Sequence, residues 1–187
     1  YWQAGKPMPL FLGLQHKLAD KMVWSKIRDR LGMDNMVAML SGSAPLSLEV
    51  QEFFAALGVI ILEAYGLTET SPGLTVNRLT NWKQGTVGQA IKGVDLKLAP
   101  DGEILAKGPN VTSGYLNREG ATAEAFDDDG WFRTGDIGVF DDDGFLKITD
   151  RKKDLIKTSG GKYVAPQKIE GLLKAKPLIT EAVVIGE

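Results

Sequence analysis

Two short segments of the sequence combine aromatic, hydroxyl and acidic side chains at spacings that suit nucleotide chemistry. The segment YGLTE at residues 65–69 places an aromatic ring, a hydroxyl group and a carboxylate in one loop. An aromatic ring can stack on a base, a hydroxyl can contact a phosphate, and Mg²⁺ prefers carboxylate oxygen as a ligand. The segment WFRTGD at 131–136 ends in Asp136, which we expect a tight Thr-Gly turn to hold. This carboxylate could accept charge-assisted hydrogen bonds from the two adjacent hydroxyls of a ribose.

Other aspartates nearby lie in DDDG segments, at 127–130 and 141–144. An Asp-Gly step between apolar stretches predicts a hairpin turn. A calcium loop would need an acidic residue at its first position, where the sequence has Ala125 and Val139. We therefore interpret both segments as solvated turns. Asp150 differs from these, because it ends a predicted strand and the basic residues 151–153 follow it directly.

Several other kinds of site are excluded or disfavoured by the residues present. The sequence has no cysteine, and therefore neither a disulfide framework nor a thiol nucleophile. Its single histidine, His16, cannot form a metal cluster with other histidines and is interpreted as ordinary structure. The GGK at 160–162 is not a Walker phosphate loop, because Ile156 stands where the first Gly is required and Tyr163 where Ser or Thr should follow.

Composition and charge limit the class of protein. The chain has 187 residues and 43% hydrophobic content, enough for one full domain and part of another. Its net charge of −2 arises from 22 basic and 24 acidic residues, so no basic field indicates nucleic acid as a partner. The absence of a signal peptide and of an apolar run of roughly 18 residues predicts a cytoplasmic protein with at most peripheral membrane contact. The start at Tyr1 and the apolar end predict an internal fragment of a longer protein.

The elements expected in the first third alternate between helix and strand. Apolar residues at 19, 22, 23 and 27 predict an amphipathic helix that Gly32 stops. Residues 36–40 and 59–62 are predicted to be buried strands, and between them Ser47 caps a helix with an apolar face from Val50 to Leu57. This is a β-α-β unit, in which ligands bind beyond the carboxyl ends of the strands. The loops at those ends are SGSAPL (41–46) and EAYGLTETSPG (63–73).

The remainder of the chain is expected to be mainly antiparallel. Residues 96–98 and 103–106 predict one hairpin, and the stretches flanking 141–144 predict another, together forming a small antiparallel sheet or barrel. A domain boundary is expected near Asp150 and Arg151. Beyond it we expect a helix with Pro166 near its start and a closing strand over 181–187. The predicted fold class is thus α/β followed by α+β.

Five segments in this order resemble the adenylate-forming (AMP-binding) superfamily over roughly residues 36–187: SGSAPL, YGLTE, GEILAKGPNVTSGY, WFRTGD and ITDRKKDLIKTSGGKYVAPQKIE. The last is most similar to long-chain fatty acyl-CoA synthetases. The resemblance implies that residues 1–150 end a large AMP-binding domain and that residues 151–187 begin a small mobile C-terminal domain. It also implies a ligase that joins a fatty acid to ATP, giving acyl-AMP and pyrophosphate, and then passes the acyl group to CoA, with Mg²⁺ as cofactor.

The resemblance also assigns roles to individual residues. Thr68, Glu69 and Arg151 would be catalytic, with Thr68 at the α-phosphate, Glu69 on Mg²⁺ and Arg151 contacting the nucleotide from the hinge side. Tyr65 would stack on adenine, and Asp136 would hold the ribose hydroxyls. The remaining residues that would bind the nucleotide or line the acyl pocket are Gly42, Ser43, Ala44 and Gly66.

Two further roles belong to the C-terminal part. Asp150 would be the hinge, and the loop that enters the site in the thioester step would comprise Ser159, Gly160, Gly161 and Lys162. Structural alternatives remain for some of these residues: Tyr65 could be a core aromatic, and Gly42 could serve a turn.

Two elements that the resemblance implies are not in these 187 residues: the Ser/Thr/Gly-rich loop around the β- and γ-phosphates, expected upstream, and the adenylation lysine, expected downstream. The chain alone is therefore expected to be inactive. Two alternatives remain open for the parent protein, namely an acyl-ACP synthetase, in which a carrier protein replaces CoA, and a non-catalytic nucleotide-binding relative. The sequence indicates neither acyl chain length nor oligomeric state.

Overall fold

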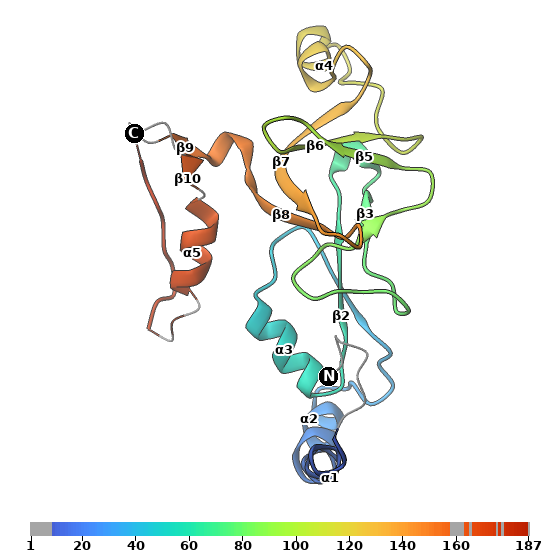
Figure 1. Cartoon of the computed structure of the whole chain (residues 1–187), viewed down its shortest axis with the longest axis vertical. Helices are drawn as coiled ribbons and strands as arrows, with labels where there is room; N and C mark the ends of the chain where they lie inside the picture. The colour runs from blue at the N-terminus through green and yellow to red at the C-terminus, as the bar shows by residue number, and fades with distance from the viewer. Residues whose placement is uncertain (1–8, 158–162, 165, 175, 177, 187) are drawn as a thin grey trace.

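A computed structural model of the chain describes residues 9–157, 163–164, 166–174, 176 and 178–186. It contains two four-stranded sheets, and a C-terminal segment that lies to one side of them (Figure 1). The predicted loop at 159–162 falls outside the described residues.

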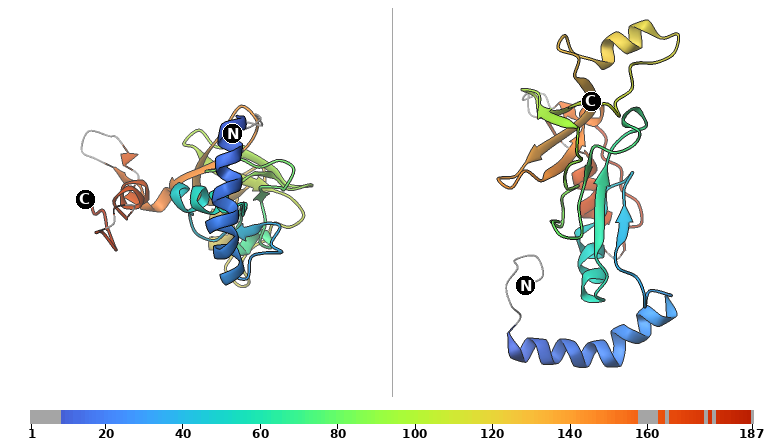
Figure 2. Two further views of the ribbon diagram at one scale, coloured as in Figure 1. Left: turned by 90° about the horizontal axis from the view of Figure 1, so that it is seen from below. Right: turned by 90° about the vertical axis from the view of Figure 1, so that its right-hand side faces the viewer.

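A long helical rod forms the N-terminal part of the described chain (Figure 2). It comprises α1 (Leu10–Ala19), a π-helical stretch η1 (Asp20–Trp24) and α2 (Ser25–Arg30), and Gly32 follows it with a φ of 68°. The helix predicted around residues 19–27 is therefore confirmed, but it begins earlier. Its apolar face is not buried: Met22 is 53% exposed and Val23 45%. Arg28 ties the rod to the rest of the chain by donating to the Leu57 carbonyl oxygen at 2.6 Å.

The predicted β-α-β unit is present. Strand β1 (Met39–Ser41) pairs in parallel with β2 (Ile61–Tyr65), and α3 (Leu48–Ala56) connects them. Ser47 caps α3 by accepting the Val50 N–H at 3.3 Å, as predicted. Both strands begin later than predicted: β1 at residue 39 instead of 36, and β2 at residue 61 instead of 59.

The prediction that the first strand is buried is wrong, because Leu40 is 71% exposed. A strand is buried on both faces only when other elements cover it, and no described element packs over β1 in this way. Two short antiparallel strands, β3 (Thr75–Val76) and β4 (Gln89–Ala90), extend the sheet in the order β1-β2-β3-β4.

The second sheet is antiparallel, in the order β5-β6-β7-β8, as the hairpin signals predicted. Its strands are β5 (Asp95–Leu98), β6 (Glu103–Lys107), β7 (Phe132–Phe140) and β8 (Leu146–Arg151). The short helix α4 (Glu119–Ala125) lies between β6 and β7. Residues of both sheets form one hydrophobic core, made of Tyr65, Leu74, Val94, Ile104, Ala106 and Leu146. Burial of these side chains packs the end of β2 against β6 and β8.

The two DDDG segments are turns, as predicted, and the same pattern of hydrogen bonds stabilises both. The first carboxylate of each accepts two backbone N–H groups: Asp127 from residues 129 and 131, and Asp141 from residues 143 and 145. Gly130 and Gly144 end the turns with φ of 75° and 77°. The first aspartates are therefore structural acceptors and not merely solvated, because the short Asp side chain can bond to the backbone that follows it.

The C-terminal segment consists of η3 (Lys152–Asp154), the antiparallel pair β9 (Ile156–Lys157) and β10 (Tyr163–Val164), and α5 (Pro166–Lys174). The helix starting at Pro166 was predicted. The strand predicted over 181–187 is wrong for the described residues 181–186, which form no strand. A strand needs a neighbour for its backbone N–H and C=O groups, and here Val183 and Ile185 are 77% and 86% exposed. No helix in the described part of the chain is both long and apolar enough to cross a bilayer.

Candidate nucleotide site

Asp136 is buried in the middle of β7, where it is 5% exposed. The predicted tight turn before it is instead an irregularity within the strand: the pairing of β6 with β7 shifts register between Glu103 and Leu105, and Gly135 has a φ of 73°. Such a bulge redirects a side chain without ending the strand. Thr134 stabilises it, because its hydroxyl accepts the Asp136 N–H at 3.2 Å and donates to the Ile104 carbonyl oxygen at 2.7 Å.

Both oxygens of Asp136 have partners from other strands. The Tyr65 hydroxyl, at the end of β2, donates to Oδ2 at 2.7 Å. Arg151, at the end of β8, places Nε 3.3 Å from Oδ1. Burial, and then the negative charge of Asp136, raise the pKa of Tyr65, so its hydroxyl remains a donor at neutral pH. The structure thus brings together three predicted residues that are far apart in sequence.

Tyr65 is 9% exposed and belongs to the hydrophobic core. This is the structural alternative that its sequence context left open, and stacking on adenine remains a prediction. Asp136 retains capacity for a further ligand, since a carboxylate has about four lone-pair sites and two partners occupy only part of them. The Arg151 side chain is 51% exposed, so it can move with little loss of packing.

The loop after Tyr65 is closely fitted around Gly66. A Cβ at this position would lie 1.5 Å from the Pro72 carbonyl oxygen, so only glycine fits. Thr70 is fully buried and closes the loop by accepting the Leu67 N–H at 2.9 Å and donating to the Pro72 carbonyl oxygen at 2.8 Å. These contacts position the short 3₁₀ helix η2 (Thr68–Thr70), which carries Thr68 and Glu69.

Thr68 and Glu69 line a hollow of about 330 Å³. The other lining residues are Ser71, Pro109, Asn110, Val111, Thr112 and Tyr115. Tyr115 donates its hydroxyl to Oε1 of Glu69 at 2.9 Å. Asn110 and Tyr115 belong to a segment that resembles the family, but the sequence assigned neither of them a role. The sequence feature that could have indicated them was only their position after a predicted hairpin.

The donors present are compatible with Mg²⁺. No group of three acidic, histidine or cysteine side chains gathers among the described residues in a way that could hold a metal. Mg²⁺ bound with a nucleotide does not require such a group, because one or two carboxylates, substrate phosphates and waters complete its coordination. The Glu69 carboxylate, at the edge of an open hollow, fits that requirement.

The SGSAPL loop follows β1 and passes close to the end of β2. A Cβ on Gly42 would lie 3.1 Å from the Ala64 carbonyl oxygen, and Ser43 has a φ of 69°. Gly42, Ser43 and Ala44 are exposed. Gly42 thus lies beside Ala64, the residue that precedes Tyr65. This is expected for loops at the carboxyl ends of two neighbouring parallel strands.

The residue directly after β8 returns to the Asp136 region through charged contacts. Lys152 places Nζ 2.7 Å from Asp101 Oδ2 and 2.7 Å from Glu103 Oε2. Glu103 is 3% exposed and also accepts the Gly135 N–H at 3.0 Å. The ion pairs raise the pKa of Lys152, mainly through Asp101, and hold the pKa of Asp101 below its usual value. Glu103 thus connects the bulge beside Asp136 with the segment that follows Arg151.

Asp150, the predicted hinge, is the penultimate residue of β8 and is 3% exposed. Its Oδ1 accepts the Arg151 N–H at 2.8 Å, and its buried Oδ2 has no partner among the described residues. Burial raises the pKa of Asp150, and the charges of Asp154 and Glu170 add to this shift. Whether the chain rotates here remains a prediction.

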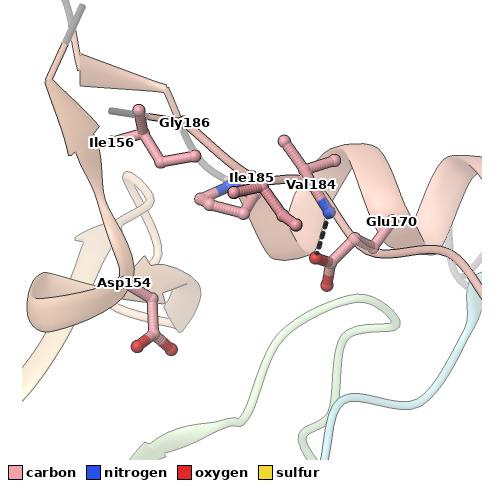
Figure 3. A pocket seen from close by; sticks show the side chains of 7 residues that line it. Asp154, Ile156, Glu170, Val184, Ile185 and Gly186 are labelled. Carbon is pink, nitrogen blue, oxygen red and sulfur yellow. Dashed lines mark hydrogen bonds between the residues drawn. The ribbon is translucent and has the colours of Figure 1, made fainter.

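A second hollow, of about 320 Å³, lies within the C-terminal segment (Figure 3). There Glu170 of α5 accepts the Val184 N–H at 2.8 Å. The residues that line it are Asp154, Ile156, Pro166, Glu170, Val184, Ile185 and Gly186. None of the predicted site residues is among them, so we do not include this hollow in the candidate site.

Known proteins are similar to this chain over most of its length. The family model "AMP-binding enzyme" matches residues 11–116. The chain is 48% identical over 178 residues to long-chain-fatty-acid–CoA ligase FadD15 of Mycobacterium bovis, covering 95% of this chain and 29% of that protein. It is 39% identical over 180 residues to long-chain-fatty-acid–CoA ligase ACSBG2 of Mus musculus, covering 93% of this chain and 27% of that protein.

A solved structure is also similar. O-succinylbenzoate CoA synthetase (MenE) of Bacillus subtilis, in complex with the acyl-adenylate intermediate OSB-AMP, superimposes with a TM-score of 0.76 at 31% identity. The match covers 88% of this chain and 37% of that one. The chain thus spans less than a third of the length of the two ligases and little more than a third of this synthetase.

Proposed function

The chain belongs to the AMP-binding enzyme family, and from this premise we propose that it is the nucleotide-binding part of an ATP-dependent long-chain fatty acid–CoA ligase. The observation that carries the proposal is that Tyr65 at the end of β2 and Arg151 at the end of β8 both contact Asp136 within β7. The loop with Thr68 and Glu69 follows directly after Tyr65. Relatives named long-chain-fatty-acid–CoA ligases support the choice of substrate and acceptor.

The proposed reaction has two steps. A fatty acid carboxylate oxygen attacks the α-phosphorus of ATP, so that a new C–O–P linkage forms and pyrophosphate leaves. The thiol of CoA then attacks the acyl carbon, a thioester forms, and AMP leaves with the bonding electron pair while the thiol proton is lost. No redox partner is required in either step.

Each predicted residue has a task in this scheme. Asp136 accepts hydrogen bonds from the ribose hydroxyls. The Thr134 contact fixes its backbone and the Tyr65 hydroxyl orients its carboxylate for this task. Arg151 supplies positive charge from the end of β8, and its half-exposed side chain can turn from Asp136 towards a phosphate. Thr68 contributes a hydroxyl to the α-phosphate. The backbone of Gly42, Ser43 and Ala44 lines the nucleotide site and the acyl pocket.

Glu69 would hold Mg²⁺ with the phosphates of the nucleotide. The metal ion, when bound, offsets negative charge that develops on the phosphate oxygens. The contribution of this chain is to present a carboxylate at the edge of the hollow, and the close fit around Gly66 keeps that loop in one conformation.

We further propose the domain division at Asp150 and Arg151, with Asp150 as hinge and the loop Ser159, Gly160, Gly161 and Lys162 serving the thioester step. The lateral position of the segment after Arg151 supports a separate unit (Figure 1). Its contacts with the sheets include the exposed ion pair of Lys152 with Asp101, which a rotation could break at low cost.

The test is to assay the gene product that contains this chain with ATP, Mg²⁺, a long-chain fatty acid and either CoA or holo-acyl carrier protein. We expect fatty acid–dependent release of AMP and pyrophosphate, and formation of acyl-CoA. Thioester formed only with the carrier protein would favour the acyl-ACP synthetase alternative. Nucleotide binding without pyrophosphate release for any fatty acid would contradict the proposal in favour of a non-catalytic relative.

A further inference from the structure

The segment 110–115, which follows β6, is attached to the loop that carries Glu69. Asn110 donates from Nδ2 to the carbonyl oxygens of Thr70 and Gly73 at 2.7 and 2.6 Å. The Thr112 N–H donates to the Glu69 carbonyl oxygen at 2.7 Å. Three hydrogen bonds thus secure the backbone of the Glu69 loop from one side.

Tyr115 adds a contact with the Glu69 carboxylate itself. Its hydroxyl donates to Oε1 at 2.9 Å, and both residues line the hollow of about 330 Å³. Among the described residues, Oε2 of Glu69 accepts no hydrogen bond. The hydrogen bond therefore fixes one oxygen of the carboxylate and leaves the other free for a ligand.

The position of Tyr115 is secured in turn by α4. Its N–H donates to Oγ1 of Thr122 at 2.9 Å. Gly114 has a φ of 146°, and a Cβ there would lie 2.5 Å from Cγ2 of Thr122, so the chain passes α4 as closely as glycine permits. Tyr115 is nevertheless 40% exposed, so packing alone does not determine the direction of its ring.

We propose that Tyr115 is a positioning residue that holds the Glu69 carboxylate over the hollow and presents Oε2 to the divalent cation of a metal–ATP substrate. This inference rests on the proposed function, and it adds a residue to which that function assigns no role. A partner that hydrogen-bonds a metal-ligating carboxylate restricts its rotamers, so binding the metal costs less conformational entropy.

The first measurement is ATP–pyrophosphate exchange by the gene product that contains this chain, at a series of Mg²⁺ concentrations. Tyr115→Phe keeps the ring and removes the hydroxyl, and we expect it to raise the Mg²⁺ concentration at half-maximal rate roughly 10- to 100-fold. The rate at saturating Mg²⁺ should change much less. Thr122→Val loosens Tyr115 from α4 but keeps the Tyr115 hydroxyl; it should lower Tm and raise the Mg²⁺ requirement less than Tyr115→Phe does.

The second measurement does not depend on activity. The 187-residue chain contains four tyrosines, so a ¹³Cζ-tyrosine NMR spectrum is simple, and Tyr115→Phe assigns the resonance of Tyr115. Glu69→Gln should shift this resonance, because the Tyr115 hydroxyl loses its charged acceptor.

The outcomes separate the two proposals. An unshifted Tyr115 resonance in Glu69→Gln, or an unchanged Mg²⁺ dependence in an active Tyr115→Phe enzyme, would overturn the positioning role alone. A wild-type protein without any pyrophosphate exchange would overturn the proposed function, and the inference that rests on it.

Discussion

At the scale of single residues, the aspartates between 131 and 154 differ in what their carboxylates contact. Asp136 is buried between Tyr65 and Arg151. Asp141 accepts two backbone N–H groups and pairs with Lys83 at 2.6 Å. Asp142 is exposed and makes no hydrogen bond or ion pair among the described residues. Residues of one type thus serve a candidate site, a turn and the solvated surface.

Asp136→Asn should raise the ATP KM of the gene product about 10- to 100-fold, because the neutral amide loses about 1.5–3 kcal/mol of charge-assisted hydrogen bonding. The measurement is the initial rate of ATP–pyrophosphate exchange against ATP concentration. Asp142→Asn is the control, and its KM should equal that of the wild type. Equal ATP dependence of the two variants would show that Asp136 does not bind the nucleotide.

Asp141→Asn should lower Tm at neutral pH, because it removes the ion pair with Lys83 and weakens the turn. The pKa of Asp141 is lowered, first by Lys83 and then by the backbone N–H of Phe145. A carboxyl group whose pKa is lower in the folded than in the unfolded protein stabilises the fold at pH values above its unfolded-state pKa of about 3.9. This stabilisation is lost as the pH falls through the lower pKa of the folded state. The Tm of the variant should therefore lie below that of the wild type near pH 6, and the two Tm values should converge as the pH falls below about 4. Asp142→Asn, measured in parallel, should show no such pH-dependent difference; if it does, the charge pair is not the cause.

At the scale of elements, the position of the site depends on close approaches between loops and strands. Gly66 lies against Pro72, and the bulge at Gly135 turns Asp136 towards Tyr65. The pairing of β7 with β8 places Asp136 opposite Arg151, and the Tyr65 hydroxyl at the end of β2 reaches Asp136. The predicted starts of β1 and β2 were early by three and two residues, and Tyr65 nevertheless lies at the end of β2.

Gly66→Ala should destabilise the chain by about 1–3 kcal/mol or more, because the new methyl group must displace the Pro72 backbone. Gly171→Ala is the matched control: nothing lies within 4 Å of its Cβ position, and it is inside α5. It should be neutral or stabilise by up to about 1 kcal/mol. Urea unfolding of the two variants checks this, and a Gly66→Ala protein as stable as the wild type would mean that the loop is less constrained than its geometry indicates.

At the scale of the whole molecule, the described part consists of two sheets with a common core, an exposed helical rod and a lateral C-terminal segment (Figures 1 and 2). Large apolar side chains of the rod are exposed, among them Leu10 at 95% and Phe11 at 72%. The residues of the candidate site are nevertheless assembled within the described part of the chain, because β2, β7 and β8 all belong to the two sheets.

The 187-residue chain by itself should not catalyse the proposed reaction. The phosphate loop and the lysine that the family resemblance implies are not in its sequence, and positioned groups act together, so the rate should be at least about 10³-fold below that of an intact ligase. The measurement is AMP and acyl-CoA formation from ATP, Mg²⁺, a long-chain fatty acid and CoA, with an intact relative assayed in parallel. Comparable turnover by the chain would mean that neither missing group is needed.

Much of the local structure follows from the sequence. Ser47, Gly32 and Pro166 begin or end helices as their types predict, and the Asp-Gly steps produce hairpin turns. These features depend on backbone conformations and short-range hydrogen bonds, which neighbouring residues determine. The ordered motifs were also sufficient to identify the family, because a motif is a property of the linear chain.

Only the tertiary structure decided the contacts between distant segments. Tyr65 and Asp136 are 71 positions apart, and no local pattern indicates that one donates to the other. The bulge at Gly135 depends on how β7 pairs with β6, and the role of Tyr115 depends on the path of the segment after β6. The failed strand over 181–186 has the same origin, because an apolar run becomes a strand only beside a partner. Pairing and burial are relations between distant parts of the chain, so their outcome is decided when the whole chain packs.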